Sequence, residues 1–182
     1  MTGKEKIATL CMTLLLAVAL PLHAVKQVEM PEDFGTSKWA VDNWSEAVGY
    51  LKYIAKDKAC KELSALPSAE RHDAWQEYWN TFEPTMGDEL RVQFFLRIRY
   101  ANENFGTILK PGWKTEMGET WIRLGAPQWR DTYALRSGGR DLEVWNYMGS
   151  RDTYLVFVDR TGLGDYDLLN YSTMIDEVYF YN

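Results

Sequence analysis

The sequence contains very little cysteine and histidine, and this scarcity limits the chemistry that it can perform. Its 182 residues include 2 Cys and 2 His, which are too few for a disulfide scaffold or for a Cys-rich zinc site with four ligands. Positive charge is not in excess either, since the formal net charge is −6, whereas nucleic-acid-binding surfaces are basic. We therefore expect no metal site, no cofactor and no nucleic-acid partner.

Aromatic residues are abundant instead. Phe, Trp and Tyr make up 14% of the chain, and hydrophobic residues as a whole make up 46%. A chain of this length and composition can bury enough apolar surface to fold around one core. No internal repeat and no low-complexity tract interrupts it, so we expect one folded domain.

The first 24 residues are typical of a secretory signal peptide. Lys4 and Lys6 precede an apolar run over residues 7–22, and Ala24 offers a small residue at the cleavage point, with Ala19 as the alternative. The run is shorter than the roughly 20 residues that a membrane-spanning helix needs. We therefore expect a cleaved signal, a periplasmic or secreted protein, and no stable membrane span after cleavage.

Helical periodicity begins at residue 44, after a polar stretch over residues 25–43 that we predict to be an extended leader. Apolar residues recur at spacings of three and four, and prolines and glycines mark the ends of the periodic segments. This pattern predicts three helices, over residues 44–66, 68–82 and 87–105.

Strand-like runs follow the predicted helices. Short segments rich in β-branched and aromatic residues predict strands over residues 121–124, 142–147, 154–158 and 166–171, and we predict a short helix over residues 174–181. Helices followed by strands indicate an α+β fold. We expect three N-terminal helices packed on a small antiparallel β-sheet of three to four strands, in one domain over residues 44–182.

One segment carries a family resemblance. Residues 112–118, Gly-Trp-Lys-Thr-Glu-Met-Gly, followed by Trp-Ile-Arg-Leu-Gly-Ala-Pro over residues 121–127, resemble the defining motif of the GWxTD-domain family. The sequences around residues 51–85, 99–106, 145–147 and 157–166 resemble further signatures of that family in the same order, so the resemblance spans about residues 45–170. The sequence departs at Glu116, where the family usually has Asp, and at Ala126, where it often has Pro.

The resemblance implies an exported bacterial protein of a family without an established molecular activity. A fainter similarity, to the small lipoproteins of the outer-membrane β-barrel assembly machinery, is an analogy about fold.

The motif and its neighbours are the candidate binding residues: Gly112, Trp113, Lys114, Thr115, Glu116, Trp129 and Arg130. In a structural interpretation, Gly112 allows a tight turn, Thr115 caps the next turn, and Trp113 packs the helices onto the sheet. In a recognition interpretation, residues 113–116 form an exposed rim beside Trp129 and Arg130. We favour the structural interpretation, and both stay open at this point.

Catalytic residue types are scarce. After signal cleavage the chain keeps one histidine, His72, without a nucleophile motif beside it, so we expect a solvated helix residue rather than a general base. We expect Cys60 to be buried. A Gly-rich turn gathers Asp159, Asp165 and Asp167, for which turn formation is favoured over calcium binding. We predict no catalytic residue.

These observations favour an exported, non-catalytic protein-interaction or structural module of the bacterial envelope, whose partner is another envelope protein. It would present a sheet edge or an aromatic-rimmed groove. The alternative is a carboxylate-dependent hydrolase or a glycan-binding domain acting in the periplasm, in which Trp and Tyr would stack on sugar rings.

Overall fold

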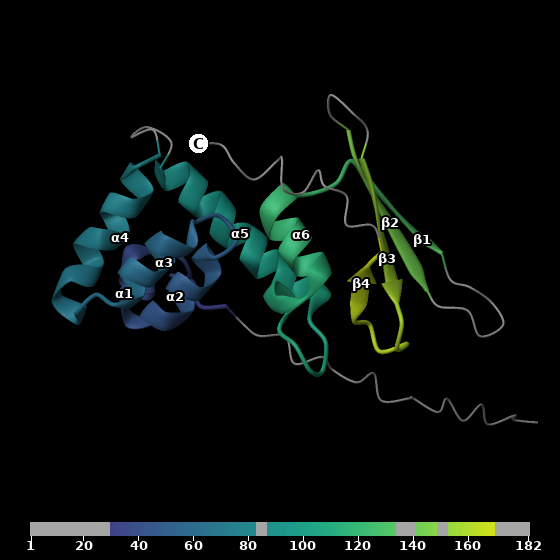
Figure 1. The fold of residues 1–182 in the computed structure, drawn as a ribbon, viewed down its shortest axis with the longest axis horizontal. Helices are drawn as coiled ribbons and strands as arrows, with labels where there is room; N and C mark the ends of the chain where they lie inside the picture. Colours follow the sequence, from purple (N-terminus) through teal and green to yellow (C-terminus); the bar gives the residue numbers. More distant parts are fainter. Residues whose placement is uncertain (1–29, 83–86, 134–140, 149–152, 170–182) are drawn as a thin grey trace, which may run out of the picture.

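The computed structural model describes residues 30–82, 87–133, 141–148 and 153–169, in which helices precede a four-stranded sheet (Figure 1). The helices are α1 (Ser37–Asp42), α2 (Trp44–Leu51), α3 (Asp57–Ser64), α4 (Arg71–Asn80), α5 (Gly87–Phe105) and α6 (Glu116–Leu124), with 3₁₀ turns η1 (Ser68–Glu70) and η2 (Gly112–Lys114). The strands are β1 (Trp129–Tyr133), β2 (Leu142–Tyr147), β3 (Thr153–Asp159) and β4 (Tyr166–Leu168). The predicted α+β class is confirmed.

The sheet is antiparallel throughout, and its strands follow the chain order β1-β2-β3-β4. Helices α5 and α6 lie on one side of it in Figure 1, so we call that side the inner face. Because side chains alternate along a strand, Trp145 and its register partners Arg130 and Leu155 point to the inner face. Val144 and its partners Asp131 and Val156 point to the opposite, outer face.

Aromatic side chains join the helices to the sheet. Phe105 at the end of α5 lies 5.4 Å, ring centre to ring centre, from Trp145 of β2, which in turn lies 4.8 Å from Phe157 of β3. Trp121 of α6 packs edge-on against Trp145 and stacks on Tyr100 of α5 at 4.0 Å. Such pairs contribute about 0.5–1.5 kcal/mol each beyond their buried area. The helical layer and the inner face therefore share one core.

The strand predicted over residues 121–124 is wrong, because this segment is the last part of α6. A short apolar run is compatible with either structure, and contacts outside it decide the outcome. Thr115 caps the start of α6. At its end, the Arg97 guanidinium donates to the carbonyls of Ile122 and Arg123, each at 3.2 Å, where a cation also favours the helix dipole.

The predicted helix over residues 44–66 is interrupted, since α2 ends at Leu51 and α3 begins at Asp57. Lys56 is extended, with φ −69° and ψ 146°. In the intervening turn Tyr53 is buried and donates its hydroxyl to the carbonyl of Trp113. The turn between α2 and α3 therefore makes a long-range contact that the local apolar periodicity does not indicate.

The predicted extended leader is also partly wrong, because residues 37–42 form α1. Thr36 caps this short helix by accepting a hydrogen bond from the amide of Trp39, at 3.2 Å. Trp39 is buried against Phe34 and Phe95. Residues 37–42 look polar and irregular in sequence, but the burial of Trp39 makes them part of the core.

The predicted helices over residues 68–82 and 87–105 are confirmed as η1 with α4 and as α5. The strands over residues 142–147 and 154–158 are confirmed as β2 and β3, and β4 takes up the start of the strand predicted over residues 166–171. Strand β1 was not predicted. The predicted signal peptide, residues 25–29 and the predicted helix over residues 174–181 lie outside the described residues.

In the described parts of the chain, no helix combines the length and the apolar character that crossing a membrane requires.

Candidate functional site

The predicted motif begins where η2 touches α5. A Cβ atom on Gly112 would lie 1.8 Å from the carbonyl oxygen of Ala101 and 2.8 Å from Cα of Asn102. Gly112 has no positive φ, so glycine is required here for close backbone approach rather than for conformation. Its absent side chain lets the motif lie directly on the backbone of α5.

Trp113 is held by polar and aromatic contacts at once. Its amide donates to the side-chain oxygen of the buried Asn102, at 3.1 Å. Its ring packs edge-on against Tyr50 at 4.8 Å and Tyr53 at 6.1 Å. Burial raises the pKa of both tyrosines, so they stay neutral hydroxyl donors at ordinary pH. Trp113 therefore packs on α2 and α5, and not onto the sheet as the sequence predicted.

Thr115 starts α6 with two hydrogen bonds. Its hydroxyl accepts from the amide of Gly118 at 3.0 Å and donates to the carbonyl of Gly112 at 2.8 Å. A Cβ on Gly118 would lie 1.8 Å from that same carbonyl oxygen. The predicted capping role of Thr115 is confirmed, and Gly118 is a helical glycine that permits close packing against Gly112.

Glu116 connects the helical layer to an edge of the sheet. Its carboxylate accepts a hydrogen bond from the backbone amide of Leu168 in β4. Helix α6 and β4 are in contact along this line. In place of the usual Asp, the longer Glu side chain thus anchors the β4 edge.

Lys114 is exposed, and its ammonium group lies 4.9 Å from the centre of the Trp113 ring. The ammonium group of Lys52 lies 5.1 Å from the same ring, and burial lowers the pKa of Lys52. Cations at this distance are attracted to an aromatic ring. Within residues 112–116, Lys114 and the partly exposed Trp113 ring are thus the side chains that a partner could reach beside Glu116.

Trp129 and Arg130 are adjacent in β1 and point to opposite faces. The Arg130 guanidinium pairs with the buried Glu143 carboxylate and lies 5.0 Å from the Trp145 ring centre on the inner face. Glu143 also accepts from the Trp145 indole at 2.6 Å. Trp129 points to the outer face and is 47% exposed. The predicted rim is therefore divided, because Arg130 pairs with Glu143 on the inner face and Trp129 lies on the outer face.

The acidic turn is closed by its own backbone. Asp159 accepts from the amides of Thr161, Gly162 and Gly164 at 2.7–3.0 Å. Burial alone would raise the pKa of Asp159, but these hydrogen bonds outweigh it and lower the pKa below its usual value. An ionised, fully engaged carboxylate is suited to turn formation, as the sequence predicted, and not to proton donation at neutral pH.

The neighbouring carboxylates have cationic partners. Asp165 pairs with Lys110 at 2.7 Å and Asp167 with Arg160 at 2.8 Å. Across the described parts of the chain, no three His, Cys, Asp or Glu side chains are grouped in a way that could hold a metal ion.

His72 and Cys60 lie on helices away from the motif. His72 is exposed on α4 beside Asp73 and Gln76, as predicted for a solvated helix residue. Cys60 on α3 is half-buried, so the prediction that it is buried is wrong. This partial burial raises the pKa of its thiol. The cause of the partial burial is that α3 is a short surface helix on which Leu63 is the buried residue.

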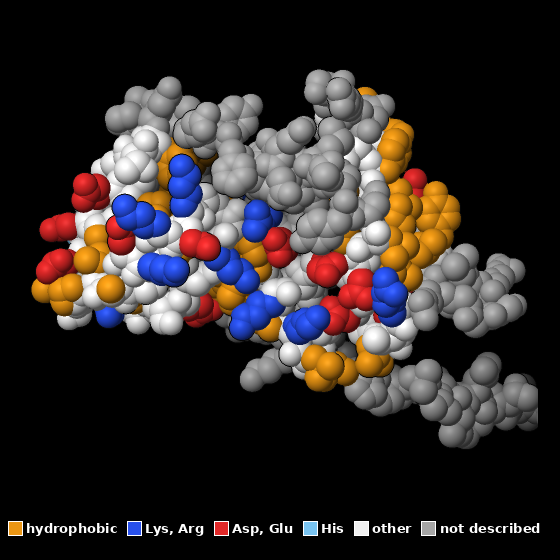
Figure 2. Space-filling view, viewed as in Figure 1, with side chains coloured by type: hydrophobic (Ala, Val, Ile, Leu, Met, Phe, Trp, Pro, Cys, Tyr) orange, Lys and Arg blue, Asp and Glu red, His pale blue; other side chains and the backbone are white. Residues whose placement is uncertain are grey.

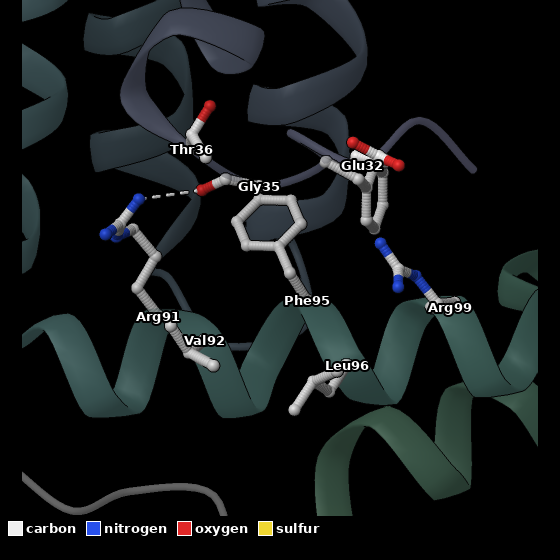
Figure 3. Close-up of a pocket in the computed structure, with 9 residues that line it drawn as sticks. Glu32, Gly35, Thr36, Arg91, Val92, Phe95, Leu96 and Arg99 are labelled. Atoms are coloured by element: carbon white, nitrogen blue, oxygen red, sulfur yellow. Dashed lines mark hydrogen bonds between the residues drawn. The ribbon is translucent and has the colours of Figure 1, made fainter.

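A hollow of about 290 Å³ lies between α5 and the segment before α1 (Figure 3). Arg91 and Arg99 flank the Phe95 ring there. Arg91 donates to the carbonyl of Gly35 at 2.9 Å, and Arg99 donates to that of Pro31 at 3.3 Å. Both arginines thus bind backbone carbonyls and fasten residues 31–35 to α5.

The outer face of the sheet is a surface that the motif did not indicate. Figure 2 shows hydrophobic side chains gathered at the strand end of the molecule. By register this face carries Trp129, Asp131 and Tyr133 of β1, Leu142, Val144 and Asn146 of β2, and Tyr154, Val156 and Val158 of β3. In the described structure, all the helices lie on the other side of the sheet (Figure 1).

Asn146 is an anomaly on this face. Its side chain is fully buried, and neither atom of its amide group has a hydrogen-bond partner in the described structure. Its register partners on either side are Trp129 and Tyr154. An unsatisfied buried amide costs about 1–3 kcal/mol. The sequence analysis named Trp129 as a candidate but missed this surface as a whole, because β1 was not predicted.

The family model for the GWxTD domain matches residues 27–179. Comparisons with curated proteins and with solved structures gave no significant match.

Proposed function

Because the chain belongs to the GWxTD-domain family, in which residues 112–118 supply the defining motif, we propose that it is an exported, non-catalytic interaction module of the bacterial envelope. Its partner is another envelope protein, bound at the outer face of the sheet beside β1. The signal-like residues 1–24 support export to the periplasm or beyond the cell.

One observation carries the proposal: an aromatic sheet face that the helices of the described residues leave uncovered (Figure 1). Trp129 is 47% and Tyr133 50% exposed on the edge strand β1. Aromatic side chains of this kind dominate the energetics of protein interfaces. The polar groups of the motif, by contrast, make contacts within the protein. Thr115 accepts a hydrogen bond from the amide of Gly118, and Glu116 accepts one from the amide of Leu168.

Asn146 gives independent support. Natural proteins keep a destabilising group where function uses it. We expect Asn146→Leu to leave the stability of the free protein unchanged or to raise it by about 1 kcal/mol, since an unsatisfied amide is removed. The same change should weaken partner binding, because Asn146 is the register partner of Trp129 and Tyr154 on the outer face. The loss of a hydrogen-bonded amide would instead lower the free energy of unfolding by about 2 kcal/mol or more. A loss of that size would show that the Asn146 amide is satisfied.

Site-specific photo-crosslinking tests the proposal. A photoreactive amino acid replaces Tyr133 in the cells that make the protein, and the matched control places it at Leu109, which is more exposed but lies in the loop after α5. We expect one discrete adduct from position 133, identified by mass spectrometry as an envelope protein, and none of that mass from position 109. Equal adducts from both positions, or none, would contradict the proposal.

The enzyme alternative has its own outcome. Glycan turnover by the purified protein that is lost in Glu116→Gln or Asp165→Asn, with folding intact, would favour a carboxylate-dependent hydrolase.

A further inference from the structure

Within the described residues, no strand lies beside the outer edge of β1. Strand order places β1 and β4 at the two edges. At the β4 edge Glu116 of α6 binds the amide of Leu168. In the described residues, β1 pairs with β2 on one side and with no strand on the other. An open edge presents unpaired backbone groups to any extended chain that approaches it.

The side chains of β1 specify what such a chain must look like. All five residues of β1 are exposed. Trp129, Asp131 and Tyr133 point to the outer face, while Arg130 points inward and is neutralised by Glu143. The outer row of this edge is therefore aromatic, acidic, aromatic. Within the described structure, Asp131 takes part in no ion pair.

We propose that β1 binds an extended segment of the partner protein by strand addition, and that this segment carries Lys or Arg opposite Asp131 with apolar residues two positions to either side. This inference rests on the proposed function and names the chemistry of the partner. Residues directly opposite in a sheet interact by about 0.2–1 kcal/mol, favourably for opposite charges and unfavourably for like charges. The pattern is symmetric about Asp131, so a parallel or an antiparallel segment meets the same requirement.

A second copy of this chain fits the edge poorly. Pairing β1 with β1 over its full length about a two-fold axis places Asp131 directly opposite Asp131 of the other copy. Like charges in that position are destabilising. Acidic charge on this edge therefore favours a basic partner segment over self-association.

The experiment pans a phage library of random twelve-residue peptides on the purified protein and, in parallel, on Asp131→Lys. We expect enriched peptides from the first to contain Lys or Arg flanked two positions away by apolar residues. We expect peptides from Asp131→Lys to contain Asp or Glu at that position instead. Exchanging Lys for Glu in a selected peptide should weaken its binding about tenfold, which corresponds to about 1.4 kcal/mol.

Two controls make the result specific. Methylation of alternate backbone nitrogens on a selected peptide removes the donors that strand addition needs, and it should abolish binding. Tyr133→Ala should lower binding of the same peptide, whereas Leu109→Ala should not, although Leu109 is the more exposed apolar residue.

Enrichment that ignores the charge at position 131, or binding that survives backbone methylation, would overturn the inference. Concentration-dependent dimerisation that is lost in Tyr133→Ala would identify a second copy of the chain as the occupant. Saturable binding of soluble cell-wall glycans at Trp129 would identify a glycan. Either result would overturn the inference. An envelope protein crosslinked at position 133 without basic-centred peptides would leave the proposed function standing and remove this inference alone. If the crosslinking and the peptide selection both fail, the proposed function and this inference are both contradicted.

Discussion

Replacement of Gly112 by alanine tests the structural role of the motif most sharply. The added Cβ would lie 1.8 Å from the carbonyl oxygen of Ala101 and 2.5 Å from its carbonyl carbon. These are backbone atoms inside α5, so no side-chain rotation relieves the overlap, and η2 must move away from the helix. That movement also weakens the hydrogen bond from the Trp113 amide to Asn102.

Overpacking of this kind costs typically 1–3 kcal/mol, and a lost hydrogen bond about 1 kcal/mol more. We therefore expect Gly112→Ala to lower the free energy of unfolding by about 3 kcal/mol. For a protein of this size, that corresponds to a fall in Tm of about 6–12 °C.

Three other glycines provide matched controls in the same assay, urea and thermal unfolding followed by circular dichroism. A Cβ on Gly118 would also meet a backbone oxygen at 1.8 Å, one on Gly106 would meet one at 3.2 Å, and one on Gly49 in α2 would have no atom within 4 Å. Gly118→Ala should match Gly112→Ala, Gly106→Ala should be mild, and Gly49→Ala should stabilise by about 0.5–1 kcal/mol. Equal effects at Gly112 and Gly49 would refute the close approach.

Three further outcomes are expected. Thr115→Val should destabilise by about 1–2 kcal/mol in urea unfolding, because it removes the cap of α6, while Thr115→Ser should stay close to the parent; equal losses in the two variants would argue against capping. Because the pKa of Asp159 is lowered on folding, its contribution to stability is present above its unfolded pKa of about 4 and lost as the pH falls through its folded value. Unfolding of Asp159→Asn should therefore depend less steeply on pH below 4 than that of the parent, and identical profiles would contradict the turn contacts. The Cys60 thiol should react more slowly with a maleimide at neutral pH than a free peptide thiol, and reach the peptide rate in denaturant, since partial burial raises its pKa; equal rates before denaturant is added would contradict that burial.

Periodicity predicted those elements whose burial follows their own local pattern. Helix α5 begins and ends where the sequence indicated, and its Phe94 and Ile98 are buried one turn apart. Strands β2 and β3 combine β-branched and aromatic residues with alternation, and both were predicted. In these segments local preference and tertiary packing agree.

Elements decided by distant contacts were not predictable in this way. The last residues of α6 have the sequence pattern of a short strand. They are helical because Thr115 caps the start of α6 and Arg97 of α5 donates hydrogen bonds to carbonyls at its end. Strand β1 has no buried residue, so it lacks the apolar alternation by which strands are recognised. For the site, the sequence identified the motif and the capping role of Thr115 but could not indicate that Glu116 reaches β4.

The central claim is that recognition belongs to the edge of the sheet and that the motif is structural. The direct test compares the affinity of the crosslinked partner for Tyr133→Ala and for Lys114→Ala, since both residues are exposed and Lys114 lies in the motif. We expect Tyr133→Ala to weaken binding about tenfold or more, as loss of an interface tyrosine does, with an unchanged unfolding midpoint, and Lys114→Ala to bind as the parent does. Weakened binding in Lys114→Ala with full affinity in Tyr133→Ala would contradict the claim.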